Sequence, residues 1–221
     1  MRGGAIFDTG WNDGMREYVV KTYYAVIGKA VRPLANSSFS PNTLTLLSLL
    51  VSLGVFFLFA VGCFFLGGLA LLLSGLLDTL DGTVARLQGR TTRFGALLDS
   101  SADRLADFLI FAGLLVYYRQ GLTFYGLLLA LAGSYLVSYV KARAESLGTI
   151  RVVGFMQRPE RILLLAAASL SAPLAAIWFP GYSEVPLVFV VWFMAVATNI
   201  TAVHRLLAAR RDLDDSSRLS G

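Results

Sequence analysis

Four aspartates interrupt the most apolar part of the sequence in two closely spaced pairs. Asp78 and Asp81 are three residues apart and Asp99 and Asp103 are four apart, so that each pair lies on one face of a helix. A charged side chain at the centre of a membrane helix costs about 2.5–3.5 kcal/mol on insertion scales. Four ionised carboxylates in such helices therefore need a compensating positive charge.

A short segment around Gly89 separates the two pairs, which predicts two antiparallel neighbouring helices with all four carboxylates at similar depth. Clustered carboxylates without histidine or cysteine ligands favour hard cations such as Mg²⁺, Mn²⁺ or Ca²⁺ over zinc. A single aspartate would more readily form a salt bridge, but four in this arrangement favour divalent metal. The arginines available for salt bridges are Arg86, Arg90, Arg93 and Arg104.

Small residues surround the predicted acidic site, each one helical turn from an aspartate: Gly82, Ala85 and Gly95. Their small size allows a ligand or a facing backbone to approach closely. Arg86 follows at one end of the site, where a guanidinium suits an anionic phosphate. Asp107 continues the acidic stripe one turn deeper, and we interpret it as a partner of Arg104 or as part of a polar cavity wall.

The composition indicates the class of protein that carries these residues. Of 221 residues, 56% are hydrophobic and only 15% are charged, compared with about 25% in soluble domains. The mean hydropathy is +0.67. The single cysteine, Cys63, lies in an apolar run and excludes a disulfide framework. No secretory signal peptide is expected, and the fold class is an all-α polytopic membrane protein.

Six apolar segments have the length required to cross a membrane: about 41–62, 64–89, 94–118, 122–148, 159–179 and 186–210. Before them, Trp11 to Arg32 alternates apolar and basic residues, which predicts an amphipathic interfacial helix. We expect an N-terminal segment at 1–39, one six-helix domain at 40–211, and a disordered polar tail at 212–221.

The distribution of basic residues predicts the orientation. Nearly all of them flank one set of junctions, whereas only Arg119 falls in a connection on the opposite side. Basic residues concentrate in cytoplasmic loops. Both termini and the acidic site are therefore expected on the cytoplasmic side of the cell membrane.

The acidic residues and their small neighbours form a continuous motif, Asp78-x2-Asp81-Gly82-x2-Ala85-Arg86-x8-Gly95-x3-Asp99-x3-Asp103. This motif resembles the signature of the CDP-alcohol phosphotransferase family. The resemblance implies a homodimer with a cavity open to the cytoplasm, in which the four aspartates hold two Mg²⁺ or Mn²⁺ ions and Asp103 is the general base. It also implies contacts to the CDP moiety from Gly82, Arg86 and Thr92 and from the Ser40-Pro41-Asn42-Thr43 turn, including Asn42 and Thr43.

The implied reaction agrees with the acidic chemistry. Phosphoryl transfer requires neutralisation of the diphosphate charge and alignment of the attacking and leaving oxygens. Two bound cations supply both and stabilise the departing CMP. The resemblance therefore implies transfer of a phosphatidyl group from CDP-diacylglycerol, or from its ether-lipid analogue, to an alcohol.

A basic set of residues near the ends of the last three apolar segments bears on the acceptor: Lys141, Arg158, Arg161 and Arg205. The Gly154 to Arg161 stretch and the run around Lys141 resemble the phosphatidylinositol phosphate synthases of the family, which implies inositol 3-phosphate as acceptor. Lys141, Arg161 and Arg205 would then bind its phosphate, together with Arg158. The alternative for each is snorkelling to lipid headgroups.

Two positions depart from that subgroup. Asn42 stands where aspartate is common, and His204 stands where glutamine is common. We interpret His204 as a polar residue at the membrane interface in preference to a catalytic base.

Other functions are open on the sequence alone. A phosphatidylglycerophosphate synthase using glycerol 3-phosphate would also need a basic acceptor site, whereas a serine-dependent synthase would not. A divalent-cation channel or transporter is a further alternative, but the sequence has no paired interrupted helices in two repeats. Membrane lipids are expected partners and nucleic acid is not.

Overall fold

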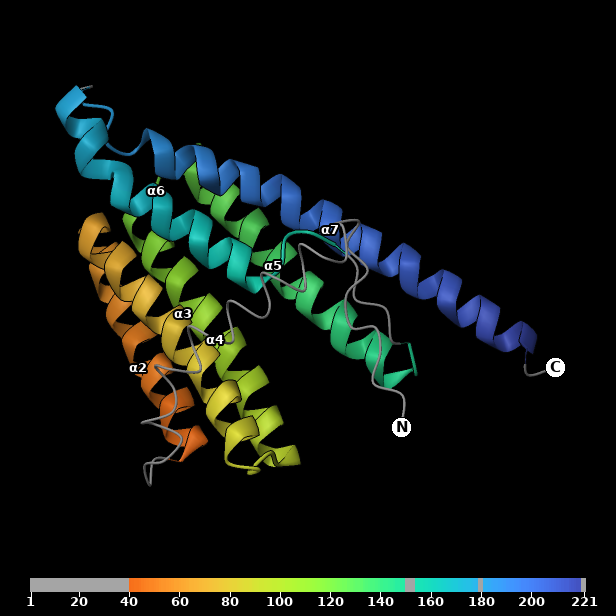
Figure 1. Ribbon diagram of the computed structural model, residues 1–221. Coiled ribbons are helices and arrows are strands. Elements are labelled where there is room, and N and C mark those ends of the chain that lie inside the picture. Colours follow the sequence, from red (N-terminus) through yellow and green to blue (C-terminus); the bar gives the residue numbers. More distant parts are fainter. Residues whose placement is uncertain (1–39, 150–153, 179–180, 220–221) are drawn as a thin grey trace, which may run out of the picture. The chain divides into compact units, whose positions relative to one another are not determined.

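The computed structural model describes residues 40–149, 154–178 and 181–219, with side chains as far as residue 214. Within these ranges all regular structure is helical, which confirms the predicted all-α class. The helices are α2 (Pro41–Ala60), α3 (Phe64–Leu87), α4 (Arg93–Tyr117), α5 (Leu122–Ser146), α6 (Arg158–Trp178) and α7 (Val185–Leu219) (Figure 1). The interfacial helix predicted at Trp11–Arg32 lies outside the described residues.

The helices have the length and composition of membrane spans. Five of the six described helices, all except α4, are long and apolar enough to cross a bilayer. Helix α4 carries Asp99, Asp103, Arg104 and Asp107 before its last ten residues, and these charges lower its hydropathy. The chain is a multi-pass membrane protein, and the sixth span at α4 stays a prediction.

The last helix differs from its prediction. The sequence predicted a helix end near Arg210 and a disordered tail over 212–221, whereas α7 continues to Leu219. An ion pair joins Arg210 Nε to Asp214 Oδ2 at 3.6 Å across one helical turn. Such pairs stabilise an exposed helix by a few tenths of a kcal/mol, which explains why polar composition alone does not end this one.

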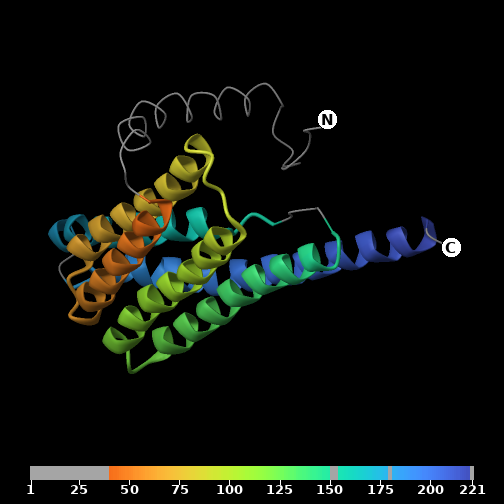
Figure 2. The ribbon, with the colours of Figure 1, turned by 90° about the horizontal axis from the view of Figure 1, so that it is seen from below.

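The chain divides into two compact units, one within residues 40–113 and the other within 114–219. In the first unit, α2 and α3 lie side by side (Figures 1 and 2). Buried hydroxyls join them: the Oγ atoms of Ser52 and Ser74 are 2.7 Å apart, and Ser74 Oγ donates to the Ser48 carbonyl at 3.1 Å. Their polar groups are satisfied inside the apolar interface.

A five-residue connection returns the chain from α3 to α4. Gly89 has a φ of +63°, a left-handed conformation that favours glycine. The Gly89 N–H donates to the Arg86 carbonyl at 3.2 Å and the Arg90 N–H donates to the Ala85 carbonyl at 3.0 Å. These two bonds form the Schellman motif that ends α3. The turn that the sequence predicted near Gly89 thus has a defined geometry.

In the second unit, α7 packs against both α5 and α6. Gly133 of α5 makes the first contact close, because a Cβ at this position would lie 2.7 Å from Asn199 Nδ2. Asn199 Nδ2 in turn donates to the Leu129 carbonyl at 3.0 Å. The α5–α7 contact is therefore tight and polar at this level.

Candidate active site

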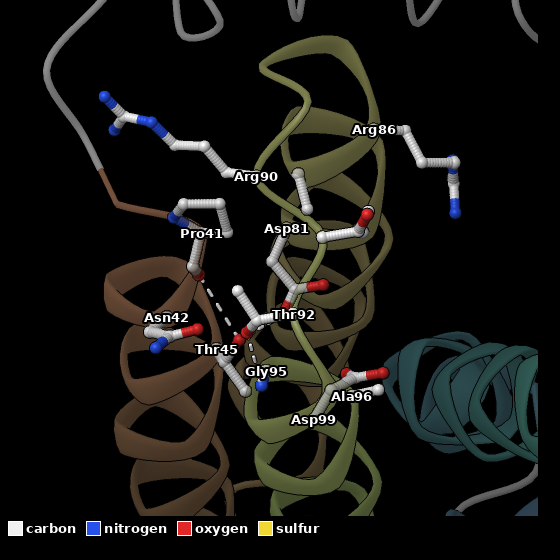
Figure 3. A pocket seen from close by; sticks show the side chains of 13 residues that line it. Pro41, Asn42, Thr45, Asp81, Arg86, Arg90, Thr92, Gly95, Ala96 and Asp99 are labelled. Atoms are coloured by element: carbon white, nitrogen blue, oxygen red, sulfur yellow. Dashed lines mark hydrogen bonds between the residues drawn. The ribbon is translucent and has the colours of Figure 1, made fainter.

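A cavity of about 170 Å³ opens among α2, α3 and α4 within the first unit (Figure 3). It contains most of the predicted nucleotide-binding residues, namely Asn42, Gly82, Arg86 and Thr92. It also contains the small residues Ala85 and Gly95 and the acids Asp81 and Asp99. Most of the motif read from the sequence therefore lines a single cavity, and Asp78 and Asp103 are not among the lining residues.

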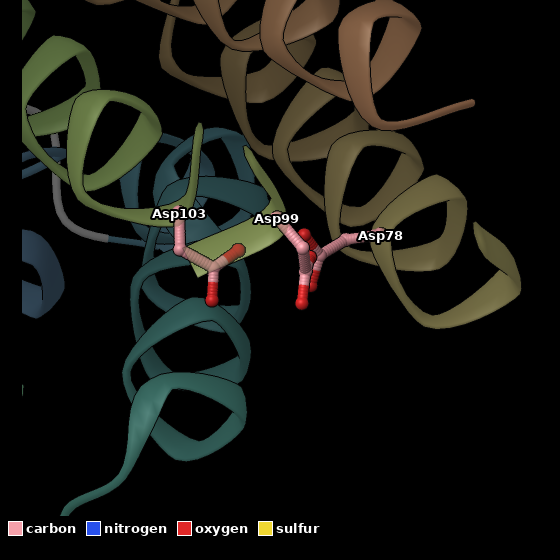
Figure 4. A group of neighbouring side chains, drawn as sticks. All are labelled: Asp78, Asp99 and Asp103. Carbon is pink, nitrogen blue, oxygen red and sulfur yellow. The ribbon is translucent and has the colours of Figure 1, made fainter. Parts of the chain in front are cut away.

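Three of the four predicted metal ligands lie together. Asp78 of α3 and Asp99 and Asp103 of α4 each offer a carboxylate oxygen, and these oxygens all lie within 4.8 Å of one another (Figure 4). All three residues are partly buried. Oxygens that share a Mg²⁺ ion at about 2.0–2.1 Å can be no more than about 4.2 Å apart, and those around Ca²⁺ about 5 Å. A small inward movement of these side chains fits them to the smaller ion.

Asp81 is held differently from the other three aspartates. It is only 4% exposed, and its Oδ2 accepts a hydrogen bond of 2.6 Å from Thr45 Oγ1 of α2. Three helical positions amount to about 300° of rotation, so Asp81 is turned about 60° away from Asp78 and toward α2. Three of the four carboxylates thus converge as predicted. Asp81 is outside this group but lines the cavity together with Asp99.

Of the two α2 residues predicted to contact the nucleotide, one reaches the cavity and the other does not. Thr43 is exposed and is absent from the cavity wall, whereas Asn42 and Thr45 both belong to it. Residues three apart share a helix face and the residue between them does not, which explains the difference. Thr45 and Arg90 were not predicted from the sequence as site residues. Arg90 lies in the cavity wall, just after the C-terminal end of α3. Thr45 lies three residues after Asn42, and this spacing was the sequence signal that could have identified Thr45.

The first turn of α4 closes the cavity. Thr92 Oγ1 accepts a hydrogen bond of 2.9 Å from the Gly95 N–H, as an N-cap residue does. A Cβ at Gly95 would lie 3.0 Å from this hydroxyl and 3.5 Å from Asn42 Oδ1. Glycine therefore keeps the capping contact intact beside the cavity. The positive end of a helix with free N–H groups favours phosphate there.

The predicted general base has an adjacent positive charge. Asp103 Oδ2 lies 3.8 Å from Arg104 Nη1, which also donates to the Ser100 carbonyl at 2.8 Å. The salt-bridge alternative considered from the sequence thus applies in part to Asp103. Asp107 is buried at 6% exposure, and its interpretation as a cavity-wall residue or a partner of Arg104 stays a prediction.

Two of the predicted acceptor residues are buried arginines of the second unit. Arg161 of α6 is 3% exposed and Arg205 of α7 is 6% exposed. Arg205 Nη1 donates to the Val137 carbonyl of α5 at 2.8 Å. The two guanidinium groups repel each other electrostatically, and Glu145 and Glu160 offset part of that repulsion. Buried like charges at this spot suit an anionic ligand.

The remaining basic predictions have less distinctive surroundings. Lys141 Nζ lies 3.8 Å from Glu145 Oε1, and both side chains are about half exposed. Arg158 is partly buried at the first position of α6. His204 is exposed, in agreement with its interpretation as an interface residue.

These features define a class: a multi-pass helical membrane protein with a cluster of carboxylates beside a cavity suited to phosphate. Residues 38–203 match the sequence profile of the CDP-alcohol phosphatidyltransferase family. The chain belongs to this family, so the predicted family and its class of enzyme, a transferase, are confirmed. Membership also decides against the channel or transporter alternative.

Two curated relatives illustrate the similarity. The phosphatidylinositol phosphate synthase of Mycobacteroides abscessus is 36% identical over 196 residues, which cover 86% of each chain. The archaetidylinositol phosphate synthase of Methanothermobacter thermautotrophicus is 36% identical over 193 residues, which cover 87% of this chain and 98% of the relative.

Solved structures show the same fold. Phosphatidylinositol phosphate synthase of Mycobacterium tuberculosis with CDP-DAG bound matches with a TM-score of 0.72 at 34% identity, over 82% of this chain and 92% of that one. The same enzyme in complex with manganese and citrate also matches with a TM-score of 0.72, at 33% identity, over 82% and 87% of the two chains.

Proposed function

We propose that this chain transfers a phosphatidyl group, or its ether-lipid equivalent, from a CDP-activated lipid to inositol phosphate and releases CMP. One observation carries the proposal: the carboxylates of Asp78, Asp99 and Asp103 lie within 4.8 Å of one another, and Asp99 also lines the motif-bearing cavity. The names of the relatives support the acceptor, since those named synthases all form inositol phosphate lipids.

The donor nucleotide fits the cavity of the first unit. Asn42 offers an amide for hydrogen bonds to the cytosine or ribose, and Arg86 offers a guanidinium for a phosphate oxygen. Gly82 and Gly95 leave room for the diphosphate near the backbone. The lipid tails would then extend between helices into the bilayer.

The acidic group fits a hard divalent cation, because its described donors are carboxylate oxygens only. The manganese-bound relative is consistent with the predicted Mg²⁺ or Mn²⁺. Asp78, Asp99 and Asp103 would hold the ions directly, and Asp81 would contribute from the cavity wall. When bound, two such ions neutralise the diphosphate and stabilise departing CMP.

The chain's own residues would then complete the transfer. The acceptor hydroxyl oxygen forms a bond to the lipid-bearing phosphorus, while the bond from that phosphorus to the CMP oxygen breaks. Asp103 takes the proton of this hydroxyl. For this step, a carboxylate oxygen of Asp103 must lie within about 3 Å of the acceptor oxygen. Arg104 next to it compensates the carboxylate charge before the proton arrives.

The acceptor's phosphate is assigned to the arginines of the second unit. Arg161 and Arg205 are buried and repel each other, so an anion between them lowers the electrostatic energy of both. Lys141 and Arg158 would add positive charge at the edge of this site. An uncharged acceptor such as inositol offers no negative charge to offset this repulsion.

The proposal includes the setting of the enzyme. The basic residues predict that both termini and the active site face the cytoplasm. Homodimerisation is part of the proposal because the family resemblance implies it.

A liposome assay tests the acceptor and the donor together. Purified enzyme with Mg²⁺ or Mn²⁺ would receive CDP-diacylglycerol or its ether analogue, and CMP release would be measured with four acceptors. These are inositol phosphate, inositol, glycerol 3-phosphate and serine. We expect efficient release only with inositol phosphate, and none after chelation of the metal.

Preference for glycerol 3-phosphate would replace the proposed acceptor by that of a phosphatidylglycerophosphate synthase. Equal rates with inositol and inositol phosphate would remove the assigned role of the arginines. The Asp214→Asn variant is a suitable control, because Asp214 pairs with Arg210 on an exposed helix surface.

A further inference from the structure

The hydroxyl of Thr45 is the closest described partner of the most buried aspartate in the motif. The Thr45 Oγ1 to Asp81 Oδ2 distance is 2.6 Å, and both residues are 4% exposed. This length is typical of a hydroxyl that donates to an ionised carboxylate. Thr45 Oγ1 also lies 3.3 Å from the Pro41 carbonyl, but a hydroxyl has one proton and the shorter contact receives it.

The bond connects residues that are 36 positions apart on two consecutive helices. Thr45 belongs to α2 and Asp81 to α3, and both line the cavity that also contains Asp99 (Figure 3). Thr45 is also fixed by its surroundings, because its neighbour Leu44 packs against Val84 of α3 in a buried apolar cluster. The donor is therefore rigid, and it holds the carboxylate plane in one orientation.

One oxygen of Asp81 is engaged by Thr45, which leaves the other as the better ligand atom. Partners of this kind orient metal-bound carboxylates, and their loss typically reduces metal affinity or activity by roughly 10–100-fold. We propose that Thr45 is a positioning residue that orients the Asp81 carboxylate toward a divalent cation shared with the Asp78, Asp99 and Asp103 group. This inference rests on the proposed function, because it requires that the acidic site bind metal.

The test compares four proteins by direct metal binding in liposomes, with Mn²⁺ as the probe and electron paramagnetic resonance of free Mn²⁺ as the readout. The variants are Thr45→Val, which keeps the shape and removes the donor, and Thr45→Ser, which restores the hydroxyl. Ser74→Ala is the matched control, since it removes a buried hydroxyl from the same α2–α3 interface without touching Asp81.

We expect Thr45→Val to weaken Mn²⁺ binding by roughly 10–100-fold and to raise the Mn²⁺ concentration that gives half-maximal CMP release. Thr45→Ser and Ser74→Ala should bind Mn²⁺ like the wild type. Thermal unfolding without metal checks that each variant is folded. If Thr45→Val does not fold, Thr45→Ala provides the same comparison, because it places no apolar methyl pair against the carboxylate.

The outcomes separate this inference from the proposed function. If the wild type binds Mn²⁺ and the folded Thr45 variant binds it equally well, the positioning role is wrong and the metal site stands. Equal weakening by Ser74→Ala would reduce Thr45 to a packing residue. A wild type that binds no Mn²⁺ would refute the proposed function itself.

Discussion

The acidic site in residues 40–113 and the arginine site in residues 114–219 concentrate opposite charges by different means. The acidic residues come from two helices joined by a five-residue connection, and Asp78 and Asp103 are only 25 positions apart. The arginines also come from two consecutive helices, Arg161 on α6 and Arg205 on α7, but these two residues are 44 positions apart. Each site places like charges in surroundings that isolated charges avoid.

The difference shows how the two ligands would be selected. Carboxylates that can approach to within 4.8 Å make a compact site for a small cation, and Thr45 fixes the one carboxylate outside that group. The arginines have broad planar guanidinium groups, and Arg205 is anchored by a backbone carbonyl. Guanidinium donors suit the several oxygens of a phosphate. Under the proposed function, the first site carries out the transfer and the second selects the acceptor.

The largest expected effect comes from Asp103→Asn, which removes the proposed base from the acidic site. CMP release from CDP-diacylglycerol should fall by about 10²–10⁴-fold, since general base catalysis contributes that much. Folding should persist, because asparagine has the same shape, and a melting curve checks this. The exposed Asp214→Asn exchange is the control. Near-normal turnover would show that another group takes the proton.

An intermediate effect is expected from Arg205→Ala at the arginine site. Loss of a charged hydrogen bond to phosphate costs about 1.5–3 kcal/mol, which corresponds to roughly a 10–150-fold rise in KM for inositol phosphate. The KM for the CDP-lipid should change little. Arg210→Ala, one and a half turns along the same helix and exposed, is the matched control. If both substrates are affected equally, Arg205 serves membrane anchoring or stability instead.

The smallest effect is expected from Gly95→Ala, which alters the wall of the donor cavity. The added methyl would lie 3.0 Å from Thr92 Oγ1, so the cap must shift by a few tenths of an ångström. We expect a severalfold rise in KM for the CDP-lipid, less than about 1.4 kcal/mol, with unchanged KM for inositol phosphate. Gly54→Ala is the control, because nothing lies within 4 Å of its Cβ position. An effect on the KM for the acceptor alone would contradict the assignment of Gly95 to the donor cavity.

The same contrast explains what could be predicted from the sequence. Apolar segment length predicted the helices closely, and the local motif predicted much of the cavity wall. The bond between Asp81 and Thr45 could not be predicted, because Thr45 lies 36 positions earlier on another helix. The burial of Arg161 and Arg205 likewise depends on how α6 and α7 pack. Contacts that are distant in sequence leave no local pattern.

The unexpected length of α7 has a consequence for where Arg205 lies in the bilayer. A helix of 35 residues is roughly 52 Å long, compared with a hydrocarbon thickness of about 30 Å. If Val185 marks one hydrocarbon boundary, Arg205 stands 20 residues further, about 30 Å along the axis and at the opposite boundary. A soluble phosphate could therefore reach this guanidinium from water, and the remaining turns of α7 would lie beyond this boundary.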